Sequence, residues 1–230
     1  MCSLFNSNKL GKLDEINCEE PVLIMMSGGI GCATLLAYLK KRGFQSLKGV
    51  FFYYNSCISK EQECAEKLAN YYNVDLEIVD ILNIYRNMVI EYNRKFEKVD
   101  DFYIPYRNGV FISVATAFAY HLRYSNVVWG TSLSSLKYYS DCHPNFIKTQ
   151  QSAVRFGTNG NVSLLMPLSE LSKLDVWRIG KRLGIPAELT WSCASSNENQ
   201  CGKCFGCLER SINAEILRTE DFQGAKVCTQ

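Results

Sequence analysis

Short apolar runs alternate with segments of helical periodicity along most of this chain. The first run, residues 21–26, is apolar throughout, which indicates a strand buried on both faces of a parallel sheet. Further strands are expected at residues 47–54, 74–79 and 126–129. Helices are expected at residues 32–42, 61–72, 85–96, 109–122, 149–156, 173–183 and 208–217. Strands that alternate with helices predict an α/β fold with a doubly wound, mostly parallel sheet.

The composition narrows the class of protein without indicating a function. A chain of 230 residues favours one domain, with room for a small appended module. The net charge of +2 indicates no basic stripe for nucleic acid, and no apolar run is long enough to span a bilayer. The N-terminal segment lacks the pattern of a signal peptide. We therefore expect a cytoplasmic protein that binds neither a membrane nor nucleic acid directly.

Cysteine usage indicates a reducing compartment and a metal site. The 11 cysteines form an odd, scattered set, which is typical of an intracellular chain. Two overlapping C-x2-C pairs and one more distant cysteine suit a tetrahedral tetrathiolate site. The four cysteines of this pattern are Cys193, Cys201, Cys204 and Cys207. We expect a structural zinc ion, because four thiolates leave no open position for water, and an iron–sulfur cluster is the alternative.

A glycine-rich turn follows the first strand and opens the first helix. It consists of Ser27, Gly28, Gly29, Ile30, Gly31 and Cys32. Glycines let a phosphate approach the backbone, and the free N–H groups and the dipole at a helix N-terminus attract the anion. Because such turns also occur in α/β proteins that bind no phosphate, this motif alone leaves both interpretations open.

Several motifs, taken in order, resemble one family of the ATP pyrophosphatase group. The Ser-Gly-Gly-Ile turn resembles the pyrophosphate loop of that group. The segments that narrow the resemblance are Tyr-Ile-Pro-Tyr-Arg-Asn at 103–108, Asp-Cys-His-Pro-Asn-Phe at 141–146, Leu-Ser-Lys at 171–173, Leu-Thr-Trp-Ser-Cys at 189–193 and Cys-Gly-Lys-Cys-Phe-Gly-Cys at 201–207. Together they resemble the 7-cyano-7-deazaguanine synthases of queuosine precursor biosynthesis, over residues 21–217. The resemblance implies a PP-loop fold, like that of the adenine nucleotide alpha hydrolases, with a zinc-binding helical module at the C-terminus.

The resemblance also implies a reaction and a domain organisation. Enzymes of this family use ATP to activate the carboxylate of 7-carboxy-7-deazaguanine, convert it with ammonia to an amide, and dehydrate the amide to a nitrile. Such adenylation needs a phosphate cradle and Mg²⁺ held by carboxylates. We expect an N-terminal extension at residues 1–20, the α/β domain at 21–190, and the zinc module packed on it at 191–230. The family further implies a homodimer.

The chain departs from the family where triphosphate and metal are expected to bind. Gly31 stands where the family has an aspartate, and Cys32 stands where it has a serine. Residues 52–58 lack the aspartate, arginine and histidine of the family's Phe-Asp-Tyr-Gly-Gln-Arg-His stretch, and Ser135 replaces a further aspartate. These losses make ATP and Mg²⁺ doubtful cofactors. The alternative is a divergent synthase whose ATP site is rebuilt by neighbours such as Glu61.

We interpret these differences as a deazaguanine pocket that is kept and an ATP site that is weakened or lost. Decarboxylation to 7-deazaguanine is a reaction of this substrate that needs no activation by ATP. That reaction needs an acid that protonates the ring carbon and groups that stabilise the developing cation. His143 replaces a family arginine, and histidine is a residue type suited to proton transfer, so it is the candidate acid, although a simple surface role is about as common. The catalytic candidates are His143, Asp141, Cys142 and Lys173, and the substrate-binding candidates are Tyr106, Arg107, Asn108, Phe146 and Trp191.

The chemistry of these side chains suggests individual roles and leaves alternatives. Asp141 would accept hydrogen bonds from the guanine edge, and Arg107 would hold the substrate carboxylate. Trp191 and Phe146 would stack on the heterocycle, although aromatic residues at such positions usually belong to the core. An ATP-dependent synthase or ligase is the main alternative, and a non-catalytic deazaguanine-binding subunit is another. A decarboxylase would suit a pathway that supplies modified guanine for nucleic acid, for example in a phage, where it would work in the host cytoplasm.

Overall fold

A five-stranded sheet forms the centre of the fold. The computed structural model describes residue 13 and residues 15–54, 59–84, 104, 106–137, 139–194 and 199–227. The strands are β1 (Val22–Met26), β2 (Leu47–Tyr53), β3 (Asp75–Asp80), β4 (Asn126–Trp129) and β5 (Ser163–Leu165). Their order in the sheet is β3-β2-β1-β4-β5, and each of these pairings is parallel. The predicted doubly wound α/β fold is confirmed.

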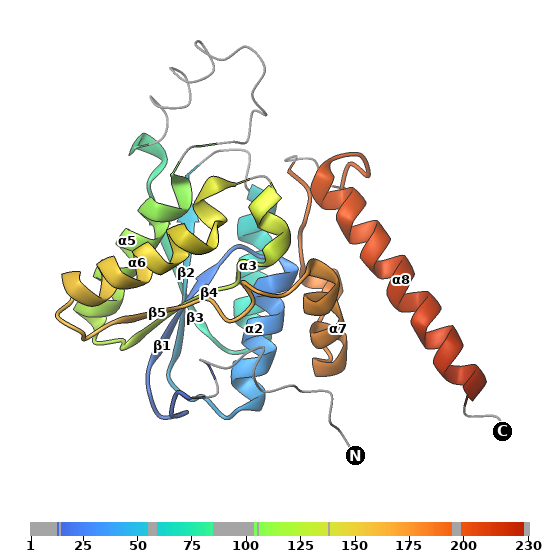
Figure 1. The fold of residues 1–230 in the computed structure, drawn as a ribbon, viewed down its shortest axis with the longest axis horizontal. Helices are drawn as coiled ribbons and strands as arrows, with labels where there is room; N and C mark the ends of the chain where they lie inside the picture. Colours follow the sequence, from blue (N-terminus) through green and yellow to red (C-terminus); the bar gives the residue numbers. More distant parts are fainter. Residues whose placement is uncertain are drawn as a thin grey trace, which may run out of the picture.

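Helices cover both faces of this sheet, as the ribbon in Figure 1 shows. The α-helices are α2 (Ile30–Lys41), α3 (Ser59–Tyr71), α5 (Arg107–Leu122), α6 (Pro144–Gly157), α7 (Lys173–Leu183) and α8 (Phe205–Val227), and the short 3-10 helices are η3 (Leu133–Lys137), η4 (Ser140–Cys142) and η5 (Ala187–Leu189). The helices α5 and α6 lie on one face, and α2 and α3 lie on the other, where α7 packs against α2. Because all strands are parallel, their carboxyl ends meet at one edge of the sheet.

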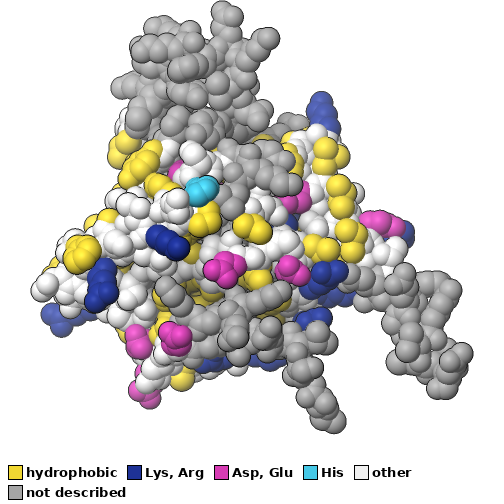
Figure 2. All heavy atoms as spheres, in the orientation of Figure 1, with side chains coloured by type: hydrophobic (Ala, Val, Ile, Leu, Met, Phe, Trp, Pro, Cys, Tyr) yellow, Lys and Arg dark blue, Asp and Glu magenta, His cyan; other side chains and the backbone are white. Residues whose placement is uncertain are grey.

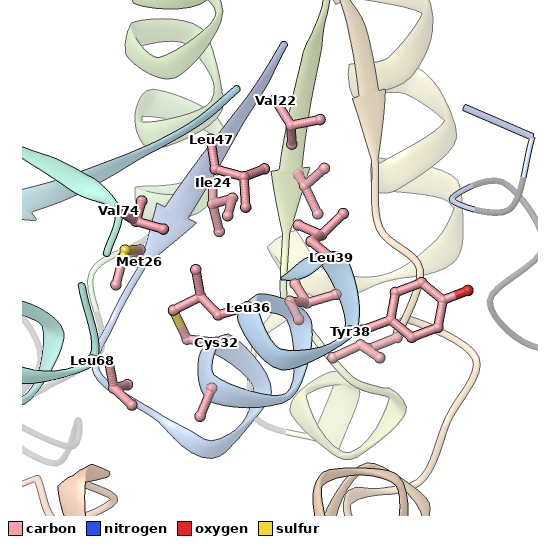
Figure 3. Packing of buried hydrophobic residues seen from close by; sticks show 14 of the residues in the cluster. Val22, Ile24, Met26, Cys32, Leu36, Tyr38, Leu39, Leu47, Leu68 and Val74 are labelled. Atoms are coloured by element: carbon pink, nitrogen blue, oxygen red, sulfur yellow. The ribbon is translucent and has the colours of Figure 1, made fainter. Parts of the chain in front are cut away.

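Alternate residues of β1 contribute to two separate cores. Val22, Ile24 and Met26 belong to the core beneath α2, and Leu23 and Met25 belong to the core on the opposite face. Figure 3 shows the first core, in which side chains of β1 and α2 pack together. All five β1 side chains are buried, and burying each such side chain stabilises the fold by about 1.5–3 kcal/mol. Burial on both faces explains why this strand shows no polar alternation.

The expected elements agree with the structure apart from a few differences. The strand β5 has no counterpart among the expected strands, because three residues are too few for a periodic pattern. The helix α6 begins at Pro144 rather than at residue 149, since proline fits the first turn and His143 caps it. The helix α8 extends to Val227, beyond the expected residues 208–217. The helix expected at 85–96 lies outside the described residues, as do Tyr103 and Pro105.

The C-terminal helix α8 leaves the body of the molecule beside α7 (Figure 1). An apolar stripe runs along its first half, where Phe205, Leu208 and Ile212 are 46%, 49% and 60% exposed. Figure 2 shows hydrophobic side chains gathered over this part of the surface. Among the described residues, no helix combines the length and the apolar character needed to cross a membrane. The division into domains at residue 190 stays a prediction.

Candidate active site and metal centre

The strand order places a crevice between β1 and β4. β2 and β3 extend the sheet on one side of β1, and β4 and β5 extend it on the other. Parallel α/β sheets bind ligands at such switch points, outside the carboxyl ends of the strands. A cavity of about 1000 Å³ opens here. Its wall includes the ends of β1 and β4, the turn after β1, and residues of α3, α5, α7 and α8.

The turn after β1 keeps the backbone of a phosphate loop. Gly28 has a φ of +67°, and the carbonyl oxygen of Glu61 in α3 lies where a Cβ atom would stand. Only glycine fits both this conformation and this close packing. Gly29 is the N-cap of α2 and has no side chain to bond the N–H groups of the first turn. Those N–H groups can therefore bind an anion.

The first turn of α2 carries no charged side chain at Gly31 or Cys32. A Cβ atom on Gly31 would lie 2.5 Å from the carbonyl oxygen of Gly130, which follows β4. A side chain at position 31 therefore requires the backbone to move. Burial raises the pKa of the Cys32 thiol to about 11, although hydrogen bonds to the backbone of Ser27 and Gly28 act in the opposite direction. A glycine and a neutral thiol offer no oxygen ligand to Mg²⁺.

Arg107 lines the cavity inside a cage of aromatic rings. Its Nη1 donates a hydrogen bond to the Tyr54 hydroxyl at 2.9 Å. The guanidinium carbon lies 5.0 Å from the ring centre of Tyr54, 5.7 Å from that of Phe111 and 5.5 Å from that of Tyr139. Such cation–π contacts hold the charged group in place. Burial raises the pKa of the Tyr54 hydroxyl to about 12, so this hydroxyl stays protonated at neutral pH.

Asp141 is buried and orients a cavity residue instead of lining the cavity itself. One of its carboxylate oxygens accepts a hydrogen bond from the Asn108 N–H at 2.8 Å, and the other accepts one from Asn108 Nδ2 at 2.9 Å. Asn108 lies in the first turn of α5, where a carboxylate also stabilises the helix dipole. The cavity wall includes Asn108 and not Asp141. The predicted contact between Asp141 and a guanine edge has no support from this geometry.

Cys142 contributes a neutral thiol to the cavity wall. Its Sγ accepts hydrogen bonds from Asn108 Nδ2 at 3.5 Å and from Thr131 Oγ1 at 3.6 Å. Burial raises the pKa of this thiol to about 11, and the bond from Thr131 acts against that rise. The thiolate is the reactive form of cysteine, so at neutral pH Cys142 is an unreactive wall residue.

Besides Asp141, three predicted catalytic or substrate-binding residues lie outside the described cavity wall. His143 is exposed at the start of α6, where its Nδ1 accepts a hydrogen bond from the Asn145 N–H at 3.2 Å. Tyr106 is 55% exposed, and its hydroxyl accepts a hydrogen bond from Gln150 Nε2 at 3.1 Å. Phe146 packs edge-on against Tyr106, with the ring centres 5.6 Å apart. The predicted acid and one predicted stacking residue are therefore separated from the cavity.

Burial shifts the pKa values of Lys173 and Glu61 in the wall. Lys173 is the first residue of α7, and burial lowers the pKa of its amine, although Glu209 acts in the opposite direction. Glu61 lies in the first turn of α3. Burial raises the pKa of its carboxyl to about 7, although Arg107 acts in the opposite direction. From the sequence, Glu61 is expected only as a substitute Mg²⁺ ligand. In the fold, its raised pKa lets the carboxyl hold a proton near neutral pH.

The four cysteines of the C-terminal motif meet at one point. Their Sγ atoms all lie within 4.8 Å of one another. The sulfurs of Cys201 and Cys207 are 3.9 Å apart, and so are those of Cys193 and Cys204. Sulfurs bound tetrahedrally at about 2.3 Å from an ion are about 3.8 Å apart, so the cluster fits one tetrathiolate ion. The N–H groups of Cys201 and Cys204 each donate to the sulfur of the preceding ligand at 3.3 Å, which stabilises the thiolate charge.

The segment before the metal ligands ties the metal centre to the phosphate loop. The N–H of Trp191 donates a hydrogen bond to the Gly28 carbonyl at 2.9 Å. From α8, Arg210 donates hydrogen bonds to Thr190 Oγ1 at 2.8 Å and to the Ala187 carbonyl at 2.7 Å. Trp191 itself lines the cavity. One wall of the cavity is therefore held between the loop and α8.

These features define a class of protein, a parallel α/β domain with a glycine-rich turn between β1 and α2 and a cysteine cluster that can hold a metal ion. Solved structures share the fold. The NMN synthetase from Francisella tularensis matches with a TM-score of 0.56 and 16% identity, over 91% of this chain and 85% of that one. The U34-tRNA thiolase NcsA from Methanococcus maripaludis, which has a [4Fe-4S] cluster, matches with a TM-score of 0.53 and 14% identity, over 94% and 72%. At these identities the likeness concerns the fold alone.

Sequence comparisons identify the family within this class. The family model described as queuosine biosynthesis protein QueC matches residues 21–216. The 7-cyano-7-deazaguanine synthase of Thermoplasma acidophilum is 32% identical over 206 residues, which cover 84% of this chain and 86% of the relative. The synthase of Methanoculleus marisnigri is 34% identical over 212 residues, which cover 86% and 95%. The chain belongs to the QueC family, as its motifs predict.

Proposed function

We propose that this chain acts on 7-carboxy-7-deazaguanine and removes its carboxylate without ATP, which yields 7-deazaguanine. Membership of the QueC family supports the substrate class. The observation that carries the choice of reaction is the packing of Gly31 against the carbonyl of Gly130. In this packing there is no room for the aspartate that the family has at position 31.

The loss of that aspartate matters because adenylation depends on carboxylates. They hold Mg²⁺ against the phosphates of ATP. In the described part of the cavity wall, the carboxylates are Glu61 and Glu209. The first turn of α2 offers Gly31 and Cys32 in place of oxygen ligands. Decarboxylation needs neither Mg²⁺ nor an activated leaving group, so this wall suits it better.

The same wall has groups for each part of the substrate. Arg107, fixed by its aromatic cage, binds the substrate carboxylate in this proposal. Asn108 uses its Nδ2 for Asp141, which leaves its amide oxygen to accept from the N–H groups of the guanine edge. Trp191 provides an aromatic ring for stacking.

ATP-dependent synthesis of 7-cyano-7-deazaguanine is the second candidate, and the comparisons favour it. The relatives that are 30–34% identical are synthases of that name. The conformation of Gly28 and the N-terminus of α2 also retain an anion-binding backbone. Under this candidate, a residue such as Glu61 replaces the missing Mg²⁺ ligand.

Mass spectrometry of the purified protein with 7-carboxy-7-deazaguanine distinguishes the candidates. Decarboxylation predicts 7-deazaguanine and CO2 in the absence of ATP. An amide or nitrile that forms only with Mg-ATP and ammonium would overturn the decarboxylase and establish the synthase. Binding without any product in either mixture would indicate a non-catalytic subunit. Thermal unfolding gives an independent measurement, because Mg-ATP raises the Tm only if the nucleotide binds the folded chain.

We also propose zinc as the ion of the cysteine cluster. Four thiolates close a tetrahedral coordination sphere, and closed sites of this kind are structural. The ion would then fix the segment that carries Trp191 against the loop at Gly28.

A further inference from the structure

Glu61 lines the cavity, and its backbone is packed against the loop. It lies in the first turn of α3, and its carbonyl oxygen packs against Gly28 of the loop. The cavity wall includes Glu61 together with Arg107 and Asn108, the residues assigned above to the substrate. Arg107 of α5 and Tyr54 after β2 are the charged and titratable neighbours that interact with this carboxyl, and Tyr139 contacts the same guanidinium. The carboxyl therefore faces the part of the cavity where the substrate carboxylate would bind.

Three other acids of this region are less suited to protonate a carbon at neutral pH. His143 lies outside the described wall, and its Nδ1 is engaged as a helix cap. Burial raises the pKa of the Cys142 thiol to about 11 and that of the Tyr54 hydroxyl to about 12, so both hold their protons too tightly. Lys173 is the competing acid of the wall, because burial lowers the pKa of its amine, although Glu209 of α8 acts in the opposite direction.

We propose that Glu61 is the catalytic acid that delivers a proton to C7 of the substrate ring, an assignment that rests on the proposed decarboxylation. The O–H bond of the carboxyl breaks as a C–H bond forms at C7, and the ring becomes a cation. The bond from C7 to the carboxylate carbon then breaks, its electron pair returns to the ring, and CO2 leaves. Glu61 remains as a carboxylate and takes a proton from water, so each turnover consumes a proton from solvent.

The pH dependence of the reaction follows from this role. The protonated form of Glu61 is active, and burial raises the pKa of its carboxyl to about 7. The rate at low substrate concentration, which measures kcat/KM, should therefore be high at acidic pH and fall as the pH rises through about 7. When the substrate carboxylate binds Arg107, it offsets the positive charge that lowers the pKa of Glu61. The descending limb for kcat should then lie at higher pH than the limb for kcat/KM.

Glu61→Gln tests the assignment, because glutamine keeps the size of the side chain and cannot donate an acidic proton. We expect kcat to fall roughly 10²–10⁴-fold with little change in KM. Glu66→Gln is the matched control, since Glu66 lies on the same helix outside the cavity wall and bonds Gln62. Glu61→Asp should retain part of the activity and the descending pH limb. Equal turnover by Glu61→Gln and the wild type would overturn the assignment, as would loss of turnover in His143→Ala alone.

Hydrogen exchange into the product provides a second readout that needs no carboxylated substrate. By microscopic reversibility, the wild type should replace the C7 hydrogen of 7-deazaguanine with deuterium in D2O. Glu61→Gln should lose this exchange while it still binds 7-deazaguanine, which shows that the variant is folded. Exchange that persists in Glu61→Gln would assign the proton transfer to another group. A wild type that neither decarboxylates nor exchanges would remove the proposed function, and the role of Glu61 with it.

Discussion

At the scale of single residues, the site depends on glycines that leave room for backbone atoms. Gly31 accommodates the carbonyl of Gly130, and Gly206 in α8 accommodates the carbonyl of Ser192 before the metal ligands. A backbone carbonyl cannot rotate out of the way as a flexible side chain can. The absence of a carboxylate at position 31 is therefore coupled to the position of the strand end at Gly130. Restoring the aspartate alone would disturb the packing before it could bind a metal.

Gly31→Ala should lower the free energy of unfolding by about 1–3 kcal/mol, because the added methyl group meets the Gly130 carbonyl. Gly157→Ala is the control, since this helical glycine has open space around its Cβ position. Alanine there should leave stability unchanged or raise it by about 0.5–1 kcal/mol. Chemical denaturation of both variants measures the difference. Equal stability of the two would show that Gly130 moves away at little cost.

Asp141→Ala should destabilise the free protein by about 1–3 kcal/mol, because it leaves the buried Asn108 N–H without an acceptor and Asn108 Nδ2 with only the Cys142 sulfur. An exposed carboxylate provides the comparison. Asp75 is paired with Lys48 at the surface, and its loss should cost less than about 1 kcal/mol. Thermal unfolding without any ligand separates the roles. A normal Tm with weakened substrate binding would return Asp141 to the guanine-recognition role expected from its motif.

At the scale of elements, local patterns predict most of the fold and only part of the site. The apolar run of β1 and the ligand spacing of the cysteine cluster are local, so both can be predicted from the sequence. The cavity wall is not local, because Glu61 and Arg107 come together only when α3 and α5 pack around the sheet. His143 is predicted as the acid because it replaces an arginine, but the following Pro144 begins α6 and makes His143 an exposed cap. Side-chain direction of this kind depends on tertiary packing.

Arg210→Lys should loosen the contact between α8 and the segment before the metal ligands. The Arg210 guanidinium bonds both Thr190 and Ala187 and lies 5.4 Å from the ring centre of Trp177. A lysine has a single amine and no planar guanidinium, so it cannot form both hydrogen bonds and also stack on the ring. We expect a loss of about 1.5–3 kcal/mol in stability and faster amide exchange at residues 187–192. Arg218→Lys is the control on the same helix, because the Arg218 side chain is 79% exposed and pairs with Glu215 at the surface. Similar behaviour of both variants would contradict the anchoring role.

At the scale of the whole molecule, the cysteine cluster and the cavity form one structural unit. The cysteine cluster holds the start of α8, Arg210 holds the preceding segment, and Trp191 in that segment bonds the loop at Gly28. Structural ions of this type contribute folding free energy directly. The contact between Trp191 and Gly28 should therefore depend on the ion, although the ion takes no part in the proposed reaction. The expected homodimer stays a prediction, and the apolar stripe of α8 is a surface on which to test it.

Cys204→Ser should release the metal ion and lower the Tm. It should also reduce turnover, because the ion would no longer hold the segment that carries Trp191 and bonds Gly28. Elemental analysis should find about one zinc per wild-type chain and much less in the variant, whereas iron with visible absorbance would indicate an iron–sulfur cluster. Cys18→Ser is the control, since Cys18 is half-buried and outside the cluster. Amide exchange at Trp191 links the two sites, and it should quicken only in the cluster variant. Metal loss without a change in exchange or turnover would mean that the cavity is built independently of the metal.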